Sequence, residues 1–410
     1  MAAYTNQSEY YSPLSPLKWY FVFFLTVFFL ISPVYVLRSG LPQPSDYFIV
    51  LALVPAFILY IVGKKGGKLP LHILVGLFFV GLTFFINMVN YVYYPDFRFI
   101  LQSVIYIYNF GLFLFCFHMF KVYPEEMRKN VYFVLVIIIF AQFISVEFFP
   151  DDKWRQTGLL NNPNQLCYWS FLTLMMIIVL KTGQKLTLLD YGLFFILFYL
   201  ESKGLSKAGM IVFALTLLIV SFTPQFTRAG RYMLLLLLGA VIYSGISNYD
   251  NLVGVTQDID TFQRIEARLS TFGQDSDDSF DAREYDRPLN FPAYLVLGAG
   301  EGAYHRFRER GDANEIHSGL VTVFFSYGIL GGILFCTFMG IIFLRLPWYY
   351  GAFVVLIFAY GIPHQHLRFS HFWLLLGMLE ASRYWMTARG GARGVSFGRP
   401  LFNKSGKLNA

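Results

Sequence analysis

The stretch WYFVFFLTVFFLISPVYV, residues 19–36, runs for 18 residues without a charged side chain. A helix needs about 20 apolar residues to cross the ~30 Å hydrocarbon core of a bilayer. The stretch therefore predicts a membrane-spanning helix, and residues 47–62 and 232–247 are uncharged in the same way. Because a second such stretch follows at once, we expect the first to be a retained helix and not a cleaved signal peptide.

The whole chain has the composition of a membrane protein. Of its 410 residues, 56% are hydrophobic and only 14% are charged, well outside the usual range of soluble domains. We predict an all-α polytopic membrane protein. Twelve spans are expected, at residues 18–36, 47–62, 71–90, 98–119, 130–149, 165–180, 187–200, 206–222, 232–248, 317–343, 347–362 and 370–386.

The longest polar segment, residues 250–316, lies between the ninth and tenth expected spans. It holds 14 of the 25 acidic residues and seven of the 32 basic ones. We expect this loop to contain short helices and to carry the chemistry of the protein. The chain then divides into residues 1–17, an N-terminal segment; 18–249, nine spans; 250–316, the loop; 317–386, three spans; and 387–410, a basic tail.

The distribution of positive charge predicts the orientation. An even number of spans puts both termini on one side, and if that side is the cytoplasm it holds 18 of the 32 Lys and Arg residues. The positive-inside rule then places both termini in the cytoplasm and the loop on the outer face. The net charge of +7 is mainly a topological signal, and the basic tail suits anionic lipid better than nucleic acid.

Two pairs of arginines in the loop are candidates for binding an anion. Arg264 and Arg268 lie four residues apart in an expected helix over 261–269, and Arg283 and Arg287 repeat the spacing. Guanidinium suits phosphate because it is always charged and donates two parallel hydrogen bonds. The alternative is that these arginines pair with nearby acids, namely Glu266, Glu284 and Asp286.

Seven other basic residues fall in short outer segments, against the insertion bias. Any one of them alone is explained by a side chain that reaches up to lipid headgroups. As a set, together with the seven in the loop, they favour an outer surface that attracts anions. The seven are Arg38, Arg98, Lys153, Arg155, Lys203, Lys207 and Arg368.

The run Gly298-Ala299-Gly300-Glu301-Gly302 predicts a tight turn. A dinucleotide-binding loop needs a strand and a helix around it, and neither is indicated here. The glycines make either a plain turn or a concave row of backbone N–H groups that holds an anion. In this position Glu301 could also orient a catalytic histidine.

His317 follows a charged stretch and opens an apolar span, so it is expected at the outer membrane interface, where imidazole titrates near neutral pH. A histidine at a helix end is also a common capping or interfacial residue. A second group, His364, His366 and His371 with Arg368, fits no close zinc-binding pattern. We expect that group to line the entrance to the site or to meet lipid headgroups.

The pattern His317-Ser318, nine residues, then Gly328-Ile329-Leu330-Gly331 resembles the motif of bacterial O-antigen ligases and of the related O-antigen and exopolysaccharide polymerases. Three other segments are similar to that family in the same order. They are Gly158 to Gln165 with its Asn-Pro-Asn core, Ser206-Lys207-Ala208-Gly209, and Gly298 to Gly302. Lys207 stands where the family commonly has arginine, and Ser318 where it commonly has asparagine.

The resemblance implies a metal-independent glycosyltransferase at the outer face of the bacterial inner membrane. It implies an undecaprenyl-diphosphate-linked glycan as donor and a sugar hydroxyl of a lipid-linked molecule as acceptor, with no cofactor. His317 would be the general base or a diphosphate ligand, and Arg283 would stabilise the leaving group. Other expected donor-binding residues are Arg264, Arg268, Arg287, Lys207 and Arg155, and expected supporting residues are Glu301, Gly298, Gly300 and Ser318.

Several alternatives remain open at this point. The preferred reading is a ligase with lipid A core as acceptor, and the alternative is a polymerase of the same family. A twelve-span transporter or flippase would be expected to show repeated halves and ionisable residues near the middle of the membrane. Neither feature is visible in the sequence. A pure scaffold would not need arginines gathered near an interfacial histidine.

Overall fold

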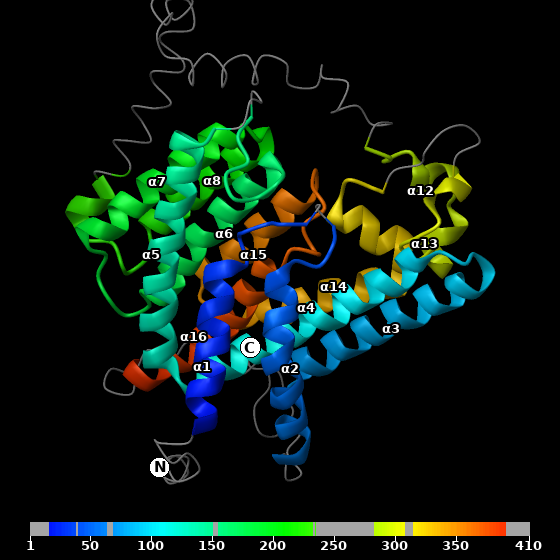
Figure 1. The fold of residues 1–410 in the computed structure, drawn as a ribbon, viewed down its shortest axis with the longest axis horizontal. Helices are drawn as coiled ribbons and strands as arrows, with labels where there is room; N and C mark the ends of the chain where they lie inside the picture. The colour runs from blue at the N-terminus through cyan, green and yellow to red at the C-terminus, as the bar shows by residue number, and fades with distance from the viewer. Residues whose placement is uncertain are drawn as a thin grey trace, which may run out of the picture.

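A computed structural model of the chain describes residues 16–37, 40–63, 69–150, 155–232, 234, 283–307 and 315–390. Its described part is a bundle of long helices with a group of short helices against one end (Figure 1). The long helices are α1 (Pro16–Ile31), α2 (Pro44–Gly63), α3 (Leu71–Tyr93), α4 (Phe97–Val122), α5 (Pro124–Phe148), α6 (Pro163–Leu180), α7 (Leu188–Gly204), α8 (Lys207–Ser221), α14 (Gly319–Arg345), α15 (Trp348–Gly361) and α16 (Ser370–Gly390). The short ones are α12 (Arg287–Asn290), α13 (Ala293–Leu297) and the 3₁₀ turn η4 (Tyr304–Phe307).

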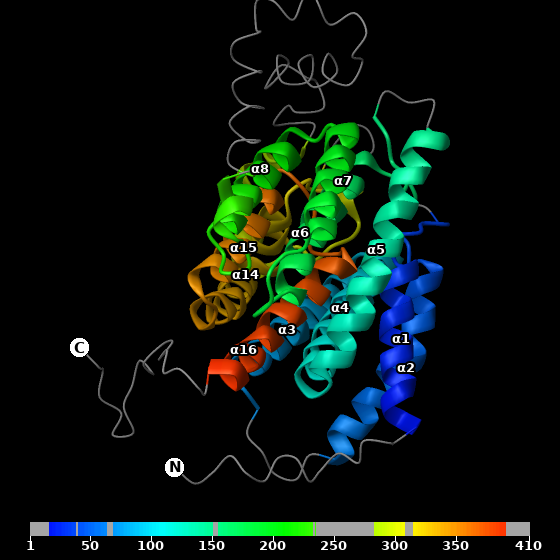
Figure 2. The ribbon, with the colours of Figure 1, turned by 90° about the vertical axis from the view of Figure 1, so that its left-hand side faces the viewer.

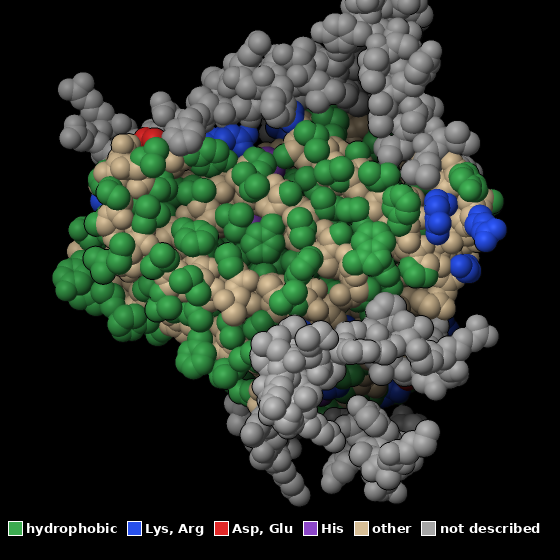
Figure 3. All heavy atoms as spheres, turned by 180° about the vertical axis from the view of Figure 1, so that it is seen from behind, with side chains coloured by type: hydrophobic (Ala, Val, Ile, Leu, Met, Phe, Trp, Pro, Cys, Tyr) green, Lys and Arg blue, Asp and Glu red, His purple; other side chains and the backbone are tan. Residues whose placement is uncertain are grey.

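Helices occur at eleven of the twelve positions expected from the sequence, and the all-α class is confirmed for the described residues. The ninth expected span, 232–248, lies almost wholly outside them, as does the helix expected at 261–269. Five helices, α3, α4, α5, α6 and α14, are long and apolar enough to cross a membrane, and shorter apolar stretches lie in α1, α2, α8 and α15. The back of the molecule is correspondingly covered with hydrophobic side chains, with basic ones near its edges (Figure 3).

The core is built around α4, α6 and α16. Helix α6 is the most enclosed of the five long apolar helices, with 83% of its apolar window buried. It lies between α7, α8, α15 and α16 in both ribbon views (Figures 1 and 2). Helices α4 and α16 approach closely because Gly377 has no side chain: a Cβ there would lie 2.8 Å from the Phe113 carbonyl oxygen. Rings of Phe338 and Trp373 stack beside this contact, 6.2 Å apart.

Several helices begin with a polar capping residue at the end of the bundle that carries the short helices. Asp96 caps α4 by accepting a hydrogen bond from the Arg98 N–H, and Asn162 caps α6 just before Pro163. Ser206 caps α8 and Ser318 caps α14 in the same way. Each cap satisfies an N–H group that the first helical turn leaves without a partner, so it fixes where the helix begins.

Helix α14 is interrupted at Gly328, whose φ of 67° and ψ of −179° are accessible to glycine alone. The break removes helical donors from the carbonyls of Phe325 and Ser326. The glycine turn supplies the replacements: the Ala299 N–H lies 3.0 Å from the Phe325 oxygen, and the Gly300 N–H 2.7 Å from the Ser326 oxygen. The turn at 298–302 and the interruption in α14 therefore form one interlocked unit.

The interlock predicts a large cost for adding a methyl group at Gly298. Its φ is 82°, and a Cβ would lie 2.8 Å from the Ser326 carbonyl oxygen. We expect Gly298→Ala to lower the free energy of unfolding by about 1–3 kcal/mol, measured by thermal unfolding in detergent. The control is Gly81→Ala, within α3, where a Cβ meets nothing within 4 Å; it should leave stability unchanged or raise it. Equal effects of the two substitutions would contradict the interlock.

Candidate functional site

Segments far apart in the sequence meet at the capped end of the bundle. They are the start of α6 with Arg155, the start of α8, the stretch that begins at Arg283, the approach to α14 at His317, and the α15–α16 connection. The contacts described next join these five segments. They bring together several of the polar residues singled out in the sequence.

His317 is held against Arg283 and the α15–α16 connection. The backbone N–H of His317 donates to the carbonyl oxygen of Arg283 at 3.2 Å. The Arg283 guanidinium in turn donates through Nη1 to the carbonyl oxygen of Pro363 at 2.5 Å. The Gly319 N–H donates to the carbonyl oxygen of His364 at 3.0 Å. These hydrogen bonds place His317, Arg283 and His364 at one position on the bundle end.

His364 links this group to the starts of α6 and α8. Its Nε2 lies 3.3 Å from the Ser206 hydroxyl, and its ring lies over Tyr360 at 4.8 Å. The Tyr360 hydroxyl donates to the backbone oxygen of Asn164 at 2.8 Å. Arg155 donates to the Asn164 side-chain oxygen at 2.6 Å and to the Gly204 oxygen at 2.9 Å.

Cations therefore surround a neutral histidine. Arg283 and Arg155 both act on His364, and Lys207, the first residue of α8, is buried next to Ser206. Burial, followed by these two arginines, lowers the pKa of His364 to about 3. His364 is consequently uncharged at physiological pH, and the positive charge that acts on it comes from Arg283 and Arg155.

His317 also favours its neutral form, although its side chain is exposed at the edge of the site. Partial burial lowers the pKa of its imidazole and Arg283 lowers it further, whereas Glu315 and Glu284 act in the opposite direction. A neutral imidazole keeps the lone pair that a general base requires. The arrangement can accept a proton beside a group of fixed cations.

A buried ion pair lies next to the histidines. Glu301 is fully buried, and Arg368 Nη2 lies 2.6 Å from its Oε2. The hydroxyls of Tyr106 and Tyr327 donate to Glu301 Oε1 at 2.8 and 2.7 Å. The Glu301 N–H donates to the side-chain oxygen of Asn87 at 2.9 Å. This network joins α3, α4 and α14 to the glycine turn and to the α15–α16 connection.

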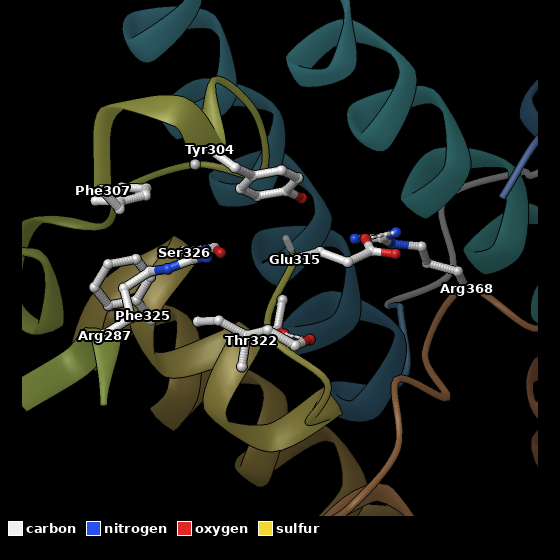
Figure 4. A pocket seen from close by; sticks show the side chains of 10 residues that line it. Arg287, Tyr304, Phe307, Glu315, Thr322, Phe325, Ser326 and Arg368 are labelled. Carbon is white, nitrogen blue, oxygen red and sulfur yellow. Dashed lines mark hydrogen bonds and ion pairs between the residues drawn. The ribbon is translucent and has the colours of Figure 1, made fainter. Parts of the chain in front are cut away.

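Arg368 also pairs with Glu315 through Nη1. A small cavity lies beside this pair, and Figure 4 shows the Tyr304 hydroxyl and the Glu315–Arg368 pair on its walls. Arg287 reaches it from the opposite side. The pair lowers the pKa of the Glu315 carboxyl and raises that of the Arg368 guanidinium. Both groups are therefore charged at any physiological pH.

Arg283 and Arg287, two of the arginines predicted to bind an anion, have different surroundings in the structure. Arg283 joins the His317 group, but Arg287 is buried, pairs with Glu284 at 2.8 Å and packs over the Phe307 ring at 5.0 Å. Arg283 lies before α12 and Arg287 begins it, so the two share no helix face. For Arg287 the alternative of pairing with a nearby acid is the one observed. Arg264 and Arg268 lie outside the described residues.

The described contacts bear on three readings that the sequence left open. The N–H groups of Gly298, Ala299, Gly300, Glu301 and Ala303 all donate to protein oxygens, so the turn is no row of N–H groups for an anion. Among the described residues Glu301 is held by Arg368 and two tyrosines, and it does not orient a histidine. His366 and His371 are buried and meet no headgroup, since a packed interior encloses both rings.

Lys207, Arg155 and Ser318, which sequence reasoning singled out, lie at this end of the bundle; their roles stay predictions. Sequence reasoning expected His364 and Arg368 at the entrance to the site or against headgroups, and it did not foresee that His364 shares a site with Arg283 or that Arg368 pairs with Glu301. It also missed Glu315, although this carboxylate stands only two residues before His317. The available signal was a histidine and an arginine four residues apart in one short connection, His364 and Arg368, directly before a span.

Comparison with known protein families and with curated protein sequences finds no match to this chain. The resemblance to the O-antigen ligases and polymerases therefore depends on the residue patterns alone.

The buried pair predicts a severe effect of removing Arg368. In Arg368→Ala the Glu301 carboxylate is left in the interior without its cation, and breaking a buried pair in this way costs about 3–5 kcal/mol. We expect unfolding of the detergent-solubilised protein at clearly lower temperature. The matched control is Lys203→Ala, because Lys203 lies 3.8 Å from Glu147 at a partly exposed position and should lose no more than about 1 kcal/mol. Similar losses in both variants would contradict the role given to Glu301 and Arg368.

Proposed function

We propose that this chain transfers a glycan from a polyprenyl diphosphate carrier to a sugar hydroxyl of a lipid-linked acceptor. The observation that supports this most directly is the meeting of His317 and Arg283 with His364, Arg155 and Lys207 at one end of an apolar helical bundle. A neutral base beside fixed cations suits a reaction in which a hydroxyl loses a proton and a diphosphate leaves.

The cations suit the leaving group. As the bond between the sugar C1 and the diphosphate oxygen breaks, that oxygen keeps the electron pair and the diphosphate gains negative charge. Arginines fixed by protein contacts stabilise this charge more strongly in the transition state than in the ground state. Arg283 and Arg155 are held by the backbone oxygens of Pro363 and Gly204, and so need little rearrangement.

His317 suits the other half of the reaction. Its neutral imidazole accepts the proton of the acceptor hydroxyl while that oxygen attacks the sugar C1. The proton then resides on His317 and the negative charge on the leaving diphosphate, so the step balances without a metal ion. His364, with the lower pKa, remains a neutral hydrogen-bonding partner of Ser206.

The remaining details of the proposal follow from the sequence. Twelve spans with cytoplasmic termini would put the capped end of the bundle on the outer face of the bacterial inner membrane. Ligation to lipid A core is the preferred reaction, and polymerisation onto a second lipid-linked glycan is the alternative. The two reactions require the same base and the same donor site and differ only in the acceptor.

Transfer by the purified chain tests the proposal. The full-length protein in lipid nanodiscs is given an undecaprenyl-diphosphate-linked glycan with either lipid A core or a second lipid-linked glycan, and the product is measured with and without chelator. We expect transfer to one of the two acceptors in both conditions. His317→Ala should lower kcat by about 10² to 10⁴ while donor affinity is retained. Arg283→Lys, which loses the bidentate geometry, should lower kcat by about 10².

The control for these substitutions is Lys185→Gln. Lys185 donates to the Pro224 oxygen at the opposite end of the bundle, so transfer should be unchanged. Loss of donor binding in His317→Ala would assign that residue to the diphosphate and overturn its role as base. Absence of transfer to both acceptors by the unsubstituted chain would overturn the proposal.

The pH dependence of kcat provides a separate test. Because the pKa of His317 is lowered, the neutral base should persist below pH 6.5, and kcat should fall only as the pH drops through the lowered pKa. Glu315 raises this pKa, so Glu315→Gln should move the acid limb to still lower pH. An acid limb that moves upward, or stays in place, in Glu315→Gln would show that another group controls it.

A further inference from the structure

We propose that Arg98 and Arg368 form a second anion site, which takes the phosphate headgroup of the acceptor lipid and has Glu315 as its exchangeable internal counterion. The inference rests on the proposed function, and it assigns the acceptor to a particular side of His317. Both acceptor classes named above carry phosphate, on lipid A core or on a polyprenyl carrier. The shared chemistry is a lipid phosphate.

The reaction joins two anionic lipids, so it needs two cationic positions around one base. Arg155, Lys207 and Arg283 form the first, next to His364. On the other side of His317 the chain continues to Glu315, which contacts Arg368. His317 is two residues from Glu315, and Arg283 of the first position and Arg368 of the second both act on its imidazole. A base near both positions suits a reaction in which a hydroxyl of one lipid-linked molecule meets the activated sugar of the other.

The two carboxylates on Arg368 differ in how firmly they are held. Glu301 is fully buried and accepts hydrogen bonds from Tyr106 and Tyr327, so replacing it with a ligand would leave these partners unsatisfied in the interior. The Glu315 side chain is 40% exposed. Glu315 can therefore reach water when a ligand takes its place on Arg368, whereas Glu301 cannot.

Arg98 supplies the second cation. It is exposed in the first turn of α4, and its guanidinium carbon lies 5.6 Å from the centre of the Tyr304 ring. Asp96, which caps α4, accepts a hydrogen bond from the Ala303 N–H at 2.7 Å and so fixes α4 beside that ring. Tyr304 and Arg368 line the same cavity (Figure 4). In agreement with this geometry, Arg368, His317 and Arg98 all lower the pKa of the Glu315 carboxyl.

The charges explain why the site would accept a phosphate only by exchange. Glu301 and Glu315 together balance Arg368 and Arg98, and a further carboxylate, Asp96, accepts hydrogen bonds from the Arg98 and Ala303 N–H groups. When Glu315 turns away, Arg368 Nη1 loses its carboxylate partner and becomes available to a phosphate, while Nη2 stays on Glu301. A lipid phosphate that gains hydrogen bonds from both Arg368 and Arg98 would then replace the Glu315 carboxylate, which pairs with Arg368.

The test compares acceptor and donor parameters in three variants of the full-length protein in nanodiscs. We expect Arg98→Gln to raise the acceptor KM about tenfold, the effect of one charged hydrogen bond, with the donor KM and kcat unchanged. Arg98→Lys should retain most of the affinity. Glu315→Gln should lower the acceptor KM, and a gain in affinity cannot result from a damaged fold. Lys185→Gln, at the opposite end of the bundle, is the control.

Equilibrium binding gives a readout that does not need transfer. One arm uses phosphorylated lipid A core, and the other uses a polyprenyl diphosphate glycan counted as a second molecule bound per chain. Lipid A core is compared with the same lipid after phosphatase treatment, and the polyprenyl diphosphate glycan with a polyprenyl glycan that lacks the diphosphate. The source of the phosphate is the lipid whose binding is weakened by Arg98→Gln only when its phosphate is present.

The outcomes separate this inference from the proposed function. If transfer occurs but Arg98→Gln alters neither acceptor KM nor binding in either arm, the second site is wrong and the proposed function stands. If no transfer occurs, the proposed function fails and binding decides. Weaker binding of phosphorylated lipid to Arg98→Gln then supports the site, and equal binding overturns it.

Discussion

The buried ion pair between Glu301 and Arg368 is the interaction on which the candidate site depends. A carboxylate in the interior is tolerable only when a cation and further hydrogen bonds replace its water shell, and Glu301 receives Arg368, Tyr106 and Tyr327. The pair fixes the connection that carries His364 relative to α4 and α14. Since that connection also holds Arg283 and the start of α14, the positions of both histidines follow from it.

A backbone constraint holds Glu301 in position for this ion pair. The interruption of α14 at Gly328 leaves two carbonyl oxygens to the turn at 298–302, and this turn carries Glu301 into the bundle. Glycine is needed both at Gly328 and at Gly298, because the two backbone segments approach too closely for a Cβ on either one. The glycines that resemble family motifs are thus explained by packing, while the cations and histidines beside them are available for chemistry.

The proposed chemistry depends on the different environments of His364 and His317. Burial, and after it the neighbouring arginines, lower the pKa of both His364 and His317, so both favour the neutral form, but only His317 is exposed. Arg283 and Arg155 are oriented by backbone oxygens, and Arg368 is shared between a fixed and an exchangeable carboxylate. A base between two cationic positions is suited to joining two phosphate-bearing lipids.

The sequence by itself determined the helical membrane class and the positions of eleven helices in the described residues, because long uncharged stretches and Ser, Asn and Asp caps are local signals. It also indicated His317, Arg283, Lys207 and Arg155. The partners were decided only by tertiary structure. Arg287 pairs with Glu284 and Glu301 with Arg368, and the N–H groups of Ala299 and Gly300 donate to α14. Spacing along the chain does not fix these choices, since a buried charge selects whichever partner the packing of distant helices brings within reach.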